Sequence, residues 1–190
     1  DQSQQTKIST IRAGNVIGGG DWSPDRIIPN CIENLSQNKS VQIRHPNAIR
    51  PFQYVLEPIS GMFCLVEKMW ENDSFDESWN IGPLLSDAPQ KIHTIVEKII
   101  KKWGTGTWQD ISDQKSFKES NLLLLNSQKA QSRLGWYPIF DIDNAISETI
   151  DWYKEYHDNP NEIESYSKNC IERYVKKAIE MKIKWARENN

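Results

Sequence analysis

The sequence lacks long apolar runs, and we therefore predict no transmembrane helix in it. No stretch approaches the roughly 18 consecutive apolar residues that a membrane-spanning helix needs. The N-terminal residues Asp-Gln-Ser-Gln-Gln-Thr-Lys are polar and lack the apolar stretch of a signal peptide. We therefore expect a cytoplasmic protein with no membrane partner, unless targeting signals lie upstream of this sequence.

Cysteine is scarce, and its three occurrences do not form a recognisable pattern. Cys31, Cys64 and Cys170 are odd in number and far apart, without a Cys-x-x-Cys or Cys/His spacing that would suggest a metal site. Cys31 and Cys64 lie in apolar, helix-like contexts, where a thiol usually serves as a small hydrophobic group. We expect structural cysteines and no bound metal ion.

The chain also lacks an excess of charge of one sign. Its 23 Lys and Arg residues are set against 26 Asp and Glu residues, which gives a net charge of -3. This balance provides no general attraction to nucleic acid, and the cationic residues after Arg173 alternate with glutamates, as on a solvated helix. With 37% hydrophobic residues over 190 positions, the chain has room for a sizeable folded core.

The most informative segment that is present runs from residue 12 to residue 29. An apolar strand is predicted over 7–17, followed by Gly18-Gly19-Gly20 and then by a helix that has Pro29 in its first turn. A strand, a glycine-rich loop and a helix start are how open α/β sheets present ligand sites at their carboxyl edge. No Gly-Lys-Ser/Thr follows, so this is not a Walker loop.

The remaining pattern predicts an alternation of strands and helices, and therefore an α/β fold. The region 104–121 is polar and irregular with Trp108 as its anchor, and the apolar run 122–125 is either a strand or a loop insertion. Glu57, near the start of a predicted helix, favours the dipole of that helix. The predicted strands cover 40–44, 52–56 and 78–82, and the predicted helices cover 29–37, 58 onward, 92–103, 127–134, 141–157 and 162–188.

Several runs resemble the second half of extended short-chain dehydrogenases of the NAD-dependent epimerase/dehydratase superfamily, and most of all the CDP-glucose 4,6-dehydratase family. The runs Gly-Gly-Gly-Asp-Trp and Arg-Pro-Phe-Gln-Tyr-Val-Leu-Glu-Pro point to this family rather than to the wider epimerase group. The order and spacing fit from residue 12 to residue 153. The matching runs are Arg-Ala-Gly-Asn-Val-Ile-Gly-Gly-Gly-Asp-Trp (12–22), Asp-Arg-Ile-Ile-Pro (25–29), Ala-Ile-Arg-Pro-Phe-Gln-Tyr-Val-Leu-Glu-Pro (48–58), Trp-Asn-Ile-Gly-Pro (79–83) and parts of 127–153.

The resemblance implies the C-terminal strands of a Rossmann-type parallel sheet plus a smaller, mainly helical α/β substrate-binding lobe. In this division, 1–17 and about 52–82 contribute to the sheet region, about 23–50 and 83–157 form the lobe, and 158–190 is a C-terminal helical extension. The family's Gly-x-x-Gly-x-x-Gly fingerprint and its Tyr-x-x-x-Lys pair are absent. We therefore assign no catalytic residue and expect a C-terminal piece that is inactive by itself.

The resemblance also implies the activity of a full-length protein. Such a protein would be a NAD-dependent lyase that converts CDP-glucose to CDP-4-keto-6-deoxyglucose for surface polysaccharide. This chain would provide the residues that bind the sugar nucleotide. Two alternatives stay open: a related epimerase or dehydratase acting on a UDP- or GDP-sugar, and a non-catalytic binding or interaction fragment. A homodimer is expected only for the full-length enzyme.

Two residues are the main candidates for substrate binding. Arg50 has a guanidinium that forks two hydrogen bonds onto a diphosphate and stays charged at any working pH. Its alternative role is a surface ion pair, or a stem that covers apolar surface. Asn15 ends the predicted strand, where its amide is able to donate to a phosphate or sugar oxygen. Its alternative role is to satisfy the backbone of the turn.

The other candidates are weaker. Arg26 and Arg44 either line the nucleotide pocket or are simply solvated, and Ile27 and Ile43 either pack on the base or belong to the core. From the resemblance alone, Ala13 and Gly14 approach the nicotinamide of NAD in a complete enzyme. Smaller expectations are that Ile28 is core, that Asp21 caps a turn, that Trp22 roofs the pocket and that Asn80 fixes a strand end.

Overall fold

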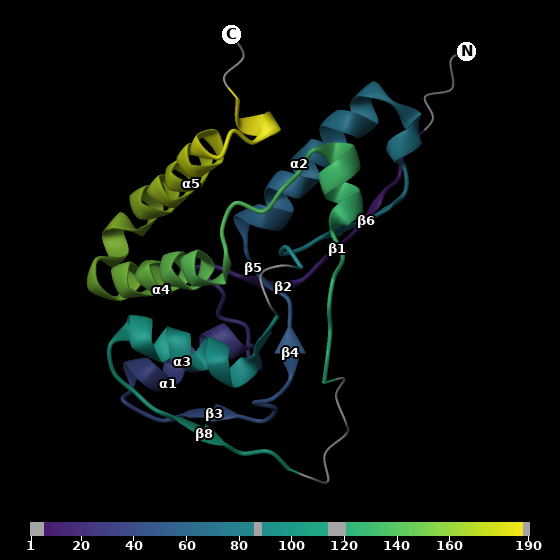
Figure 1. Cartoon of the computed structure of the whole chain (residues 1–190). Helices are drawn as coiled ribbons and strands as arrows, with labels where there is room; N and C mark the ends of the chain where they lie inside the picture. The colour runs from purple at the N-terminus through teal and green to yellow at the C-terminus, as the bar shows by residue number, and fades with distance from the viewer. Residues whose placement is uncertain (1–5, 86–88, 114–120, 188–190) are drawn as a thin grey trace.

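The computed structural model describes residues 6–85, 89–113 and 121–187 (Figure 1). The strands are β1 (Thr10–Ala13), β2 (Asn15–Ile17), β3 (Val41–Ile43), β4 (Ile49–Arg50), β5 (Phe52–Tyr54), β6 (Ser78–Ile81), β7 (Gln90–Lys91) and β8 (Trp108–Asp110). The α-helices are α1 (Ile27–Ser36), α2 (Leu56–Glu71), α3 (Ile92–Trp103), α4 (Ile142–Asp158) and α5 (Ile163–Glu180). The single-turn helices are η1 (Asp73–Phe75), η2 (Ala130–Leu134), η3 (Pro160–Glu162) and η4 (Lys184–Ala186).

The strands pair in two-stranded ladders, most of which are parallel. β1 pairs with β6, β2 with β5 and β3 with β8 in parallel, while β4 and β7 are antiparallel. A parallel pair needs a crossover connection, and the connection from β1 to its partner β6 contains helices α1 and α2. The expected α/β class is therefore confirmed, with short parallel pairs in place of one wide sheet.

The strand expected over 7–17 is in fact two strands with different partners, and that part of the prediction is wrong. The break lies at Gly14, where a Cβ would sit 2.2 Å from the Pro51 carbonyl oxygen. The Asn15 N–H donates to the same oxygen at 2.7 Å. Because the Pro51 backbone enters here, the chain leaves β6 and continues beside β5.

The helices form two clusters around separate cores. In the lower part of Figure 1, α1, α3 and the β3–β8 ladder pack together, and α4 lies against α3 with α5 beyond it. Their shared core contains Cys31, Val41, Ile99 and Tyr153. A second, smaller core lies between α2, β6 and η2 in the upper part, with Trp79 and Trp136 fully buried. Trp185 contacts both cores.

Two segments differ from the sequence expectation, and a third decides between two alternatives. The helix expected over 162–188 ends at Glu180, because Lys182 adopts a left-handed conformation with φ of 57°. The expected irregular region contains strand β8, although Trp108 does anchor it: its ring stacks on His93 and its Nε1 donates to Glu97. In the run 122–125, Leu122 forms an isolated parallel bridge with Ile49 and Leu122 to Leu124 are exposed, so the run is a loop.

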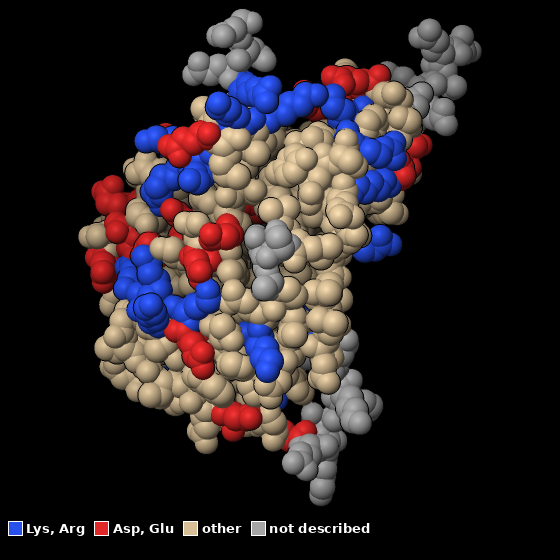
Figure 2. Space-filling model, in the orientation of Figure 1, with Lys and Arg blue, Asp and Glu red and all other residues tan. Residues whose placement is uncertain are grey.

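The expected helix ends and the structural role of the cysteines are confirmed. Gly104 and Gly135 close α3 and η2 in left-handed conformations, with φ of 111° and 68°. All three cysteines are buried free thiols, and burial raises the pKa of the Cys31 thiol to about 12. None of the helices within the described residues is both long enough and apolar enough to cross a bilayer. Figure 2 shows cationic and anionic side chains intermingled over the α4–α5 side.

Candidate functional site

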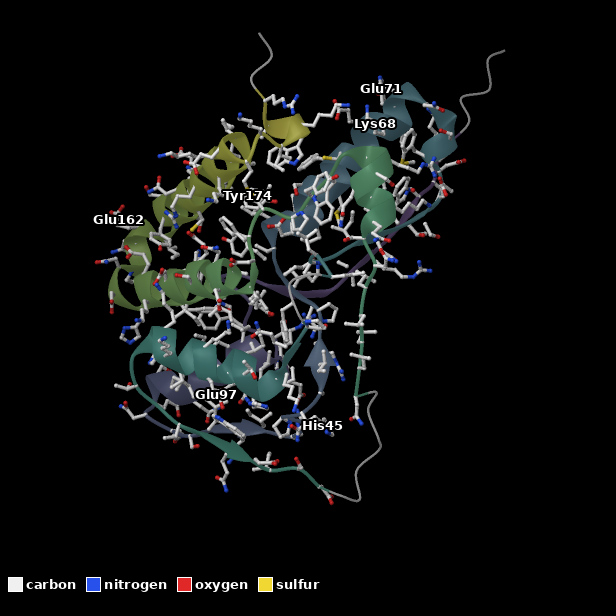
Figure 3. The ribbon with its side chains drawn as sticks, viewed as in Figure 1. His45, Lys68, Glu71, Glu97, Glu162 and Tyr174 are labelled. Atoms are coloured by element: carbon white, nitrogen blue, oxygen red, sulfur yellow. The ribbon has the colours of Figure 1, made fainter. Side chains whose placement is uncertain are left out.

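A cleft of about 1210 Å³ opens beside the glycine loop. This volume is ample for a nucleotide-sized ligand, since small-molecule sites measure roughly 300–1,000 Å³. The walls come from β2, from the loop 18–26 and α1, from the β3 end including His45, and from the β4–β5 segment (Figure 3). The predicted site residues that line it are Gly14, Asn15, Arg26, Ile27, Ile43, Arg44 and Arg50; Ala13 does not.

The parallel β2–β5 pair brings Asn15 and Arg50 to the same cleft. Asn15 lies opposite Phe52 in the ladder, and Arg50 precedes Phe52 by two residues at the end of β4. The Asn15 side chain is exposed and Arg50 is half-buried, with Arg50 Nη1 donating to the Ile49 carbonyl at 2.9 Å. The two segments are far apart in sequence, so strand pairing is what unites them.

Arg26 and Arg44 stand at the rim, where each faces a carboxylate. Arg44 Nη2 contacts Asp25 Oδ1 at 2.5 Å, and Arg26 Nε lies 3.8 Å from Asp21 Oδ2. The Arg26 and Arg44 side chains are 61% and 63% exposed. Exposed pairs of this kind contribute at most about 1 kcal/mol, so the two guanidinium groups remain available to a stronger anion.

The apolar wall of the cleft shares its residues with the core. Ile43 is buried and Ile27 is half-buried, and both line the cleft while they pack with the main core. Ile28 is buried, as expected of a core residue. Ile27 and Ile43 therefore belong to the core, and their packing against a base stays a prediction.

The glycine loop is shaped by an aromatic cluster on α4. A Cβ on Gly19 would lie 2.0 Å from the Trp152 ring, and Gly20 has φ of 80°. Tyr153 donates its hydroxyl to the Asp21 carbonyl at 2.6 Å, and the Trp22 ring meets Tyr153 edge-on at 5.1 Å. The glycines thus allow the loop to approach Trp152, which fixes the rim of the cleft.

Three smaller predictions for this loop and for β6 agree with the structure. Asp21 Oδ1 accepts from the Ser23 N–H at 3.0 Å and so caps the turn. Trp22 lines the cleft while remaining 56% exposed. Asn80 Nδ2 donates to the Asn126 carbonyl at 3.2 Å, which ties the end of β6 to the following segment.

A second polar cluster lies away from the cleft, and sequence reasoning missed it. Glu57 is fully buried, and its carboxylate accepts from the Ile139 and Phe140 N–H groups at 3.0 and 2.8 Å. The Tyr174 hydroxyl donates to Glu57 Oε2 at 2.8 Å and lies 3.0 Å from Ser60 Oγ, which accepts from Trp136 Nε1. This cluster joins α2 to α5 (Tyr174 is labelled in Figure 3).

Burial perturbs both ionisable members of this Glu57 cluster. Desolvation raises the pKa of Glu57 to about 7, although the backbone N–H groups and Tyr174 oppose the rise. Desolvation, and then the Glu57 charge, raise the pKa of Tyr174 well above its usual range. The only local signal in the sequence was the acidic residue near a helix start; its partners lie about 80 to 120 residues away, as the 117-residue separation to Tyr174 illustrates.

Comparison with known proteins gives this geometry a context. The chain is 37% identical over 150 residues to CDP-glucose 4,6-dehydratase of Salmonella typhimurium, and the match covers 78% of this chain and 42% of that protein. The chain is thus related to part of CDP-glucose 4,6-dehydratase. It is also 22% identical to mouse dTDP-D-glucose 4,6-dehydratase over 157 residues, 81% of this chain and 43% of that protein. No family model matches the chain.

Solved structures place the fold in the same group. The chain superposes on dTDP-glucose 4,6-dehydratase from Bacillus anthracis, solved in complex with NAD, with a TM-score of 0.67 and 19% identity. The UDP-glucuronic acid 4-epimerase of Bacillus cereus gives a TM-score of 0.68 and 20% identity. These matches cover 80% and 78% of this chain and 46% of each structure. The fold is that of the C-terminal part of Rossmann-like epimerases and dehydratases, and the chain spans less than half the length of these relatives.

Proposed function

We propose that this chain is the sugar-nucleotide-binding part of a NAD-dependent 4,6-dehydratase that acts on CDP-glucose. The observation that carries the proposal is the convergence of three arginines and Asn15 on one cleft, in a chain 37% identical to CDP-glucose 4,6-dehydratase. A cleft with several guanidinium groups and an apolar wall suits a ligand that combines a diphosphate with a flat base.

In this proposal, each cleft residue binds a different part of the ligand. Arg50 binds the diphosphate with forked hydrogen bonds, and Arg26 and Arg44 add positive charge at the rim. Asn15 donates its amide to a phosphate or sugar oxygen, while Ile27 and Ile43 supply an apolar surface for the base. Binding energy gathered at the diphosphate orients the distant sugar for reaction.

In the full-length enzyme, bound NAD would supply reversible hydride transfer to and from the sugar, with Gly14 at the edge of its site. Of the two cofactor candidates in this chain, at most one lies where it could contact NAD. Gly14 lines the cleft, although the Pro51 carbonyl alone explains its missing Cβ, and Ala13 pairs with Ile81 outside the cleft. Most of the NAD site therefore lies outside this chain.

Calorimetric titration of the chain with CDP-glucose, CDP and UDP-glucose tests the proposal. We expect the CDP ligands to bind more tightly than UDP-glucose, and Arg50→Ala to weaken binding. Arg173→Ala is the matched control, because Arg173 pairs with Glu148 on α4 and does not line the cleft. Unchanged affinity in Arg50→Ala would refute the site assignment.

The same titration separates the alternatives. The likeness to UDP-glucuronic acid 4-epimerase favours a UDP-sugar as the second candidate, and tighter binding of UDP-glucose would establish it. If the chain joined to the unmatched part of the Salmonella relative binds CDP-glucose without turning it over, the function is binding alone. A cytoplasmic location and a homodimer of the full-length enzyme are part of the same proposal.

A further inference from the structure

Arg50 lies between two cavities of very different size. It lines the large cleft, and it also lines a second cavity of about 30 Å³ together with Gln90 of β7. We call the second one the small cavity; it has no room for a nucleotide. Of the described residues that line it, Arg50 and Gln90 alone carry polar side chains, and the rest are proline, leucine, isoleucine and phenylalanine.

Strand pairing places the Arg50 and Gln90 side chains next to each other. In the antiparallel β4–β7 ladder, Arg50 lies directly opposite Gln90. Side chains of directly opposed residues share one face of the ladder, with Cβ atoms about 4.5–5.5 Å apart. The Ile92 N–H donates to the Ala48 carbonyl at 2.9 Å and fixes the register just after Gln90. Gln90 is therefore held beside Arg50 by the backbone.

The other edge of β4 is also held in place. The Ile49 N–H donates to the Asn121 carbonyl at 2.8 Å, and the Leu123 N–H donates to the Ile49 carbonyl at 3.1 Å. Arg50 Nη1 donates to the same Ile49 carbonyl at 2.9 Å. A guanidinium carries five N–H donors in a planar fork, so its two edges are able to serve different acceptors at once. The backbone of Arg50 is thus fixed, and its side-chain neighbours decide where the fork points.

The Gln90 side chain presents a buried acceptor. Its Oε1 is enclosed and has no hydrogen-bond partner among the residues that the structure describes. A buried polar atom without a partner is unfavourable, so its retention in a native fold calls for a physical reason. An amide oxygen forms its strongest hydrogen bonds with cationic donors. Because the other walls of the small cavity are apolar, the Arg50 guanidinium is the donor that suits this oxygen.

We propose that Gln90 is a positioning residue for Arg50. With a diphosphate in the cleft, one edge of the guanidinium donates to Gln90 Oε1 and the other edge donates to the phosphate oxygens. The amide is uncharged, so it directs the guanidinium without competing for it as a carboxylate does. This inference rests on the proposed function, in which Arg50 binds the diphosphate. It adds a residue that does not line the cleft to those that set the affinity.

Gln90→Met tests the role of the amide. Methionine is similar in length and volume, suits the apolar walls and is only a weak acceptor. We expect about tenfold weaker binding of CDP in calorimetric titration, because a hydrogen bond to a charged group is lost. The urea midpoint should stay the same or rise, because a buried oxygen without a partner is removed. A purely structural glutamine would give lower stability and unchanged affinity.

Two further variants tie the effect to Arg50. Gln109→Met is the matched control, since Gln109 is exposed on β8 and lines neither cavity. It should leave CDP affinity unchanged. In an Arg50→Ala background, adding Gln90→Met should change CDP affinity by less than about twofold, because no guanidinium remains to be positioned.

The outcomes keep this inference apart from the proposed function. If Arg50→Ala weakens CDP binding and Gln90→Met does not, the role of Gln90 is overturned and the proposed function stands. Equal losses from Gln90→Met with and without Arg50 would also overturn it, because the amide would then act on the ligand by another route. Unchanged affinity in Arg50→Ala would remove the assignment of Arg50, and both proposals would fall together.

Discussion

The cleft and the Glu57 cluster both contain charged and hydrogen-bonding side chains, but these side chains are exposed in the cleft and buried in the cluster. At the cleft rim, Arg26 and Arg44 face carboxylates in water and are held loosely. In the Glu57 cluster, a fully buried carboxylate accepts from two backbone N–H groups and one hydroxyl. Exposed polar groups stay available to a ligand, whereas enclosed groups are committed to the fold.

Removal of the Glu57 carboxylate should produce the largest effect. Glu57→Ala leaves the Ile139 and Phe140 N–H groups and the Tyr174 hydroxyl without an acceptor inside the protein. We expect the free energy of unfolding to fall by about 3–5 kcal/mol, measured by urea denaturation. Glu67→Ala, at an exposed position on the same helix, should change it by less than about 0.5 kcal/mol. Similar losses in the two variants would contradict the role of the cluster.

The pH dependence of stability should sharpen the comparison. Because the pKa of Glu57 is raised from 4.5 to about 7, the folded protein binds this proton more tightly than the unfolded chain does. The stabilisation is complete below about pH 4.5 and is lost as the pH rises through about 7, by about 2–3 kcal/mol. Urea unfolding of the wild type at several pH values should show this loss, and Glu57→Gln should not. If Glu57→Gln lost the same stability over this pH range as the wild type, a group other than Glu57 would be responsible.

At the cleft, Arg50→Ala should affect ligand binding and leave folding intact. Loss of charge-assisted hydrogen bonds worth about 1.5–3 kcal/mol corresponds to about 10- to 100-fold weaker binding of CDP-glucose by calorimetry. Arg50→Lys should fall between wild type and Arg50→Ala, because an ammonium keeps the charge without the fork. An Arg50→Lys protein with wild-type affinity would show that charge alone is recognised.

Gly19→Ala should have a smaller effect, but one that appears in both protein stability and ligand binding. The new methyl group meets the Trp152 ring, which must shift together with the loop at the cleft rim. We expect a loss of about 1–3 kcal/mol of stability and weaker CDP-glucose binding in the same variant. Glu67→Ala, an exposed change outside the cleft, serves as the control. Stability loss without any change in affinity would separate the loop from the site.

Local patterns in the sequence located the strand, the glycine loop and the helix start that form part of the cleft, but they did not locate the Glu57 cluster. The strand, glycine loop and helix start lie within residues 7–37, and the amphipathic pattern of 92–103 also predicted its helix correctly. The split at Gly14 was missed because it depends on Pro51, and the Glu57 cluster was missed because its partners are remote. Strand β8 was missed because its residues are mostly polar and exposed. For the split at Gly14 and for the Glu57 cluster the deciding contact is long-range, and periodicity does not encode such contacts.

The aspartates at the cleft mouth have a further consequence. Asp21 and Asp25 keep two guanidinium groups stationed at the rim while no ligand is bound, at a cost too small to resist a dense anion. Under the proposed function, a diphosphate would gain more than a singly charged anion by displacing these two aspartates, because it carries more charge. The carboxylates at the cleft mouth would then favour ligands of high charge density.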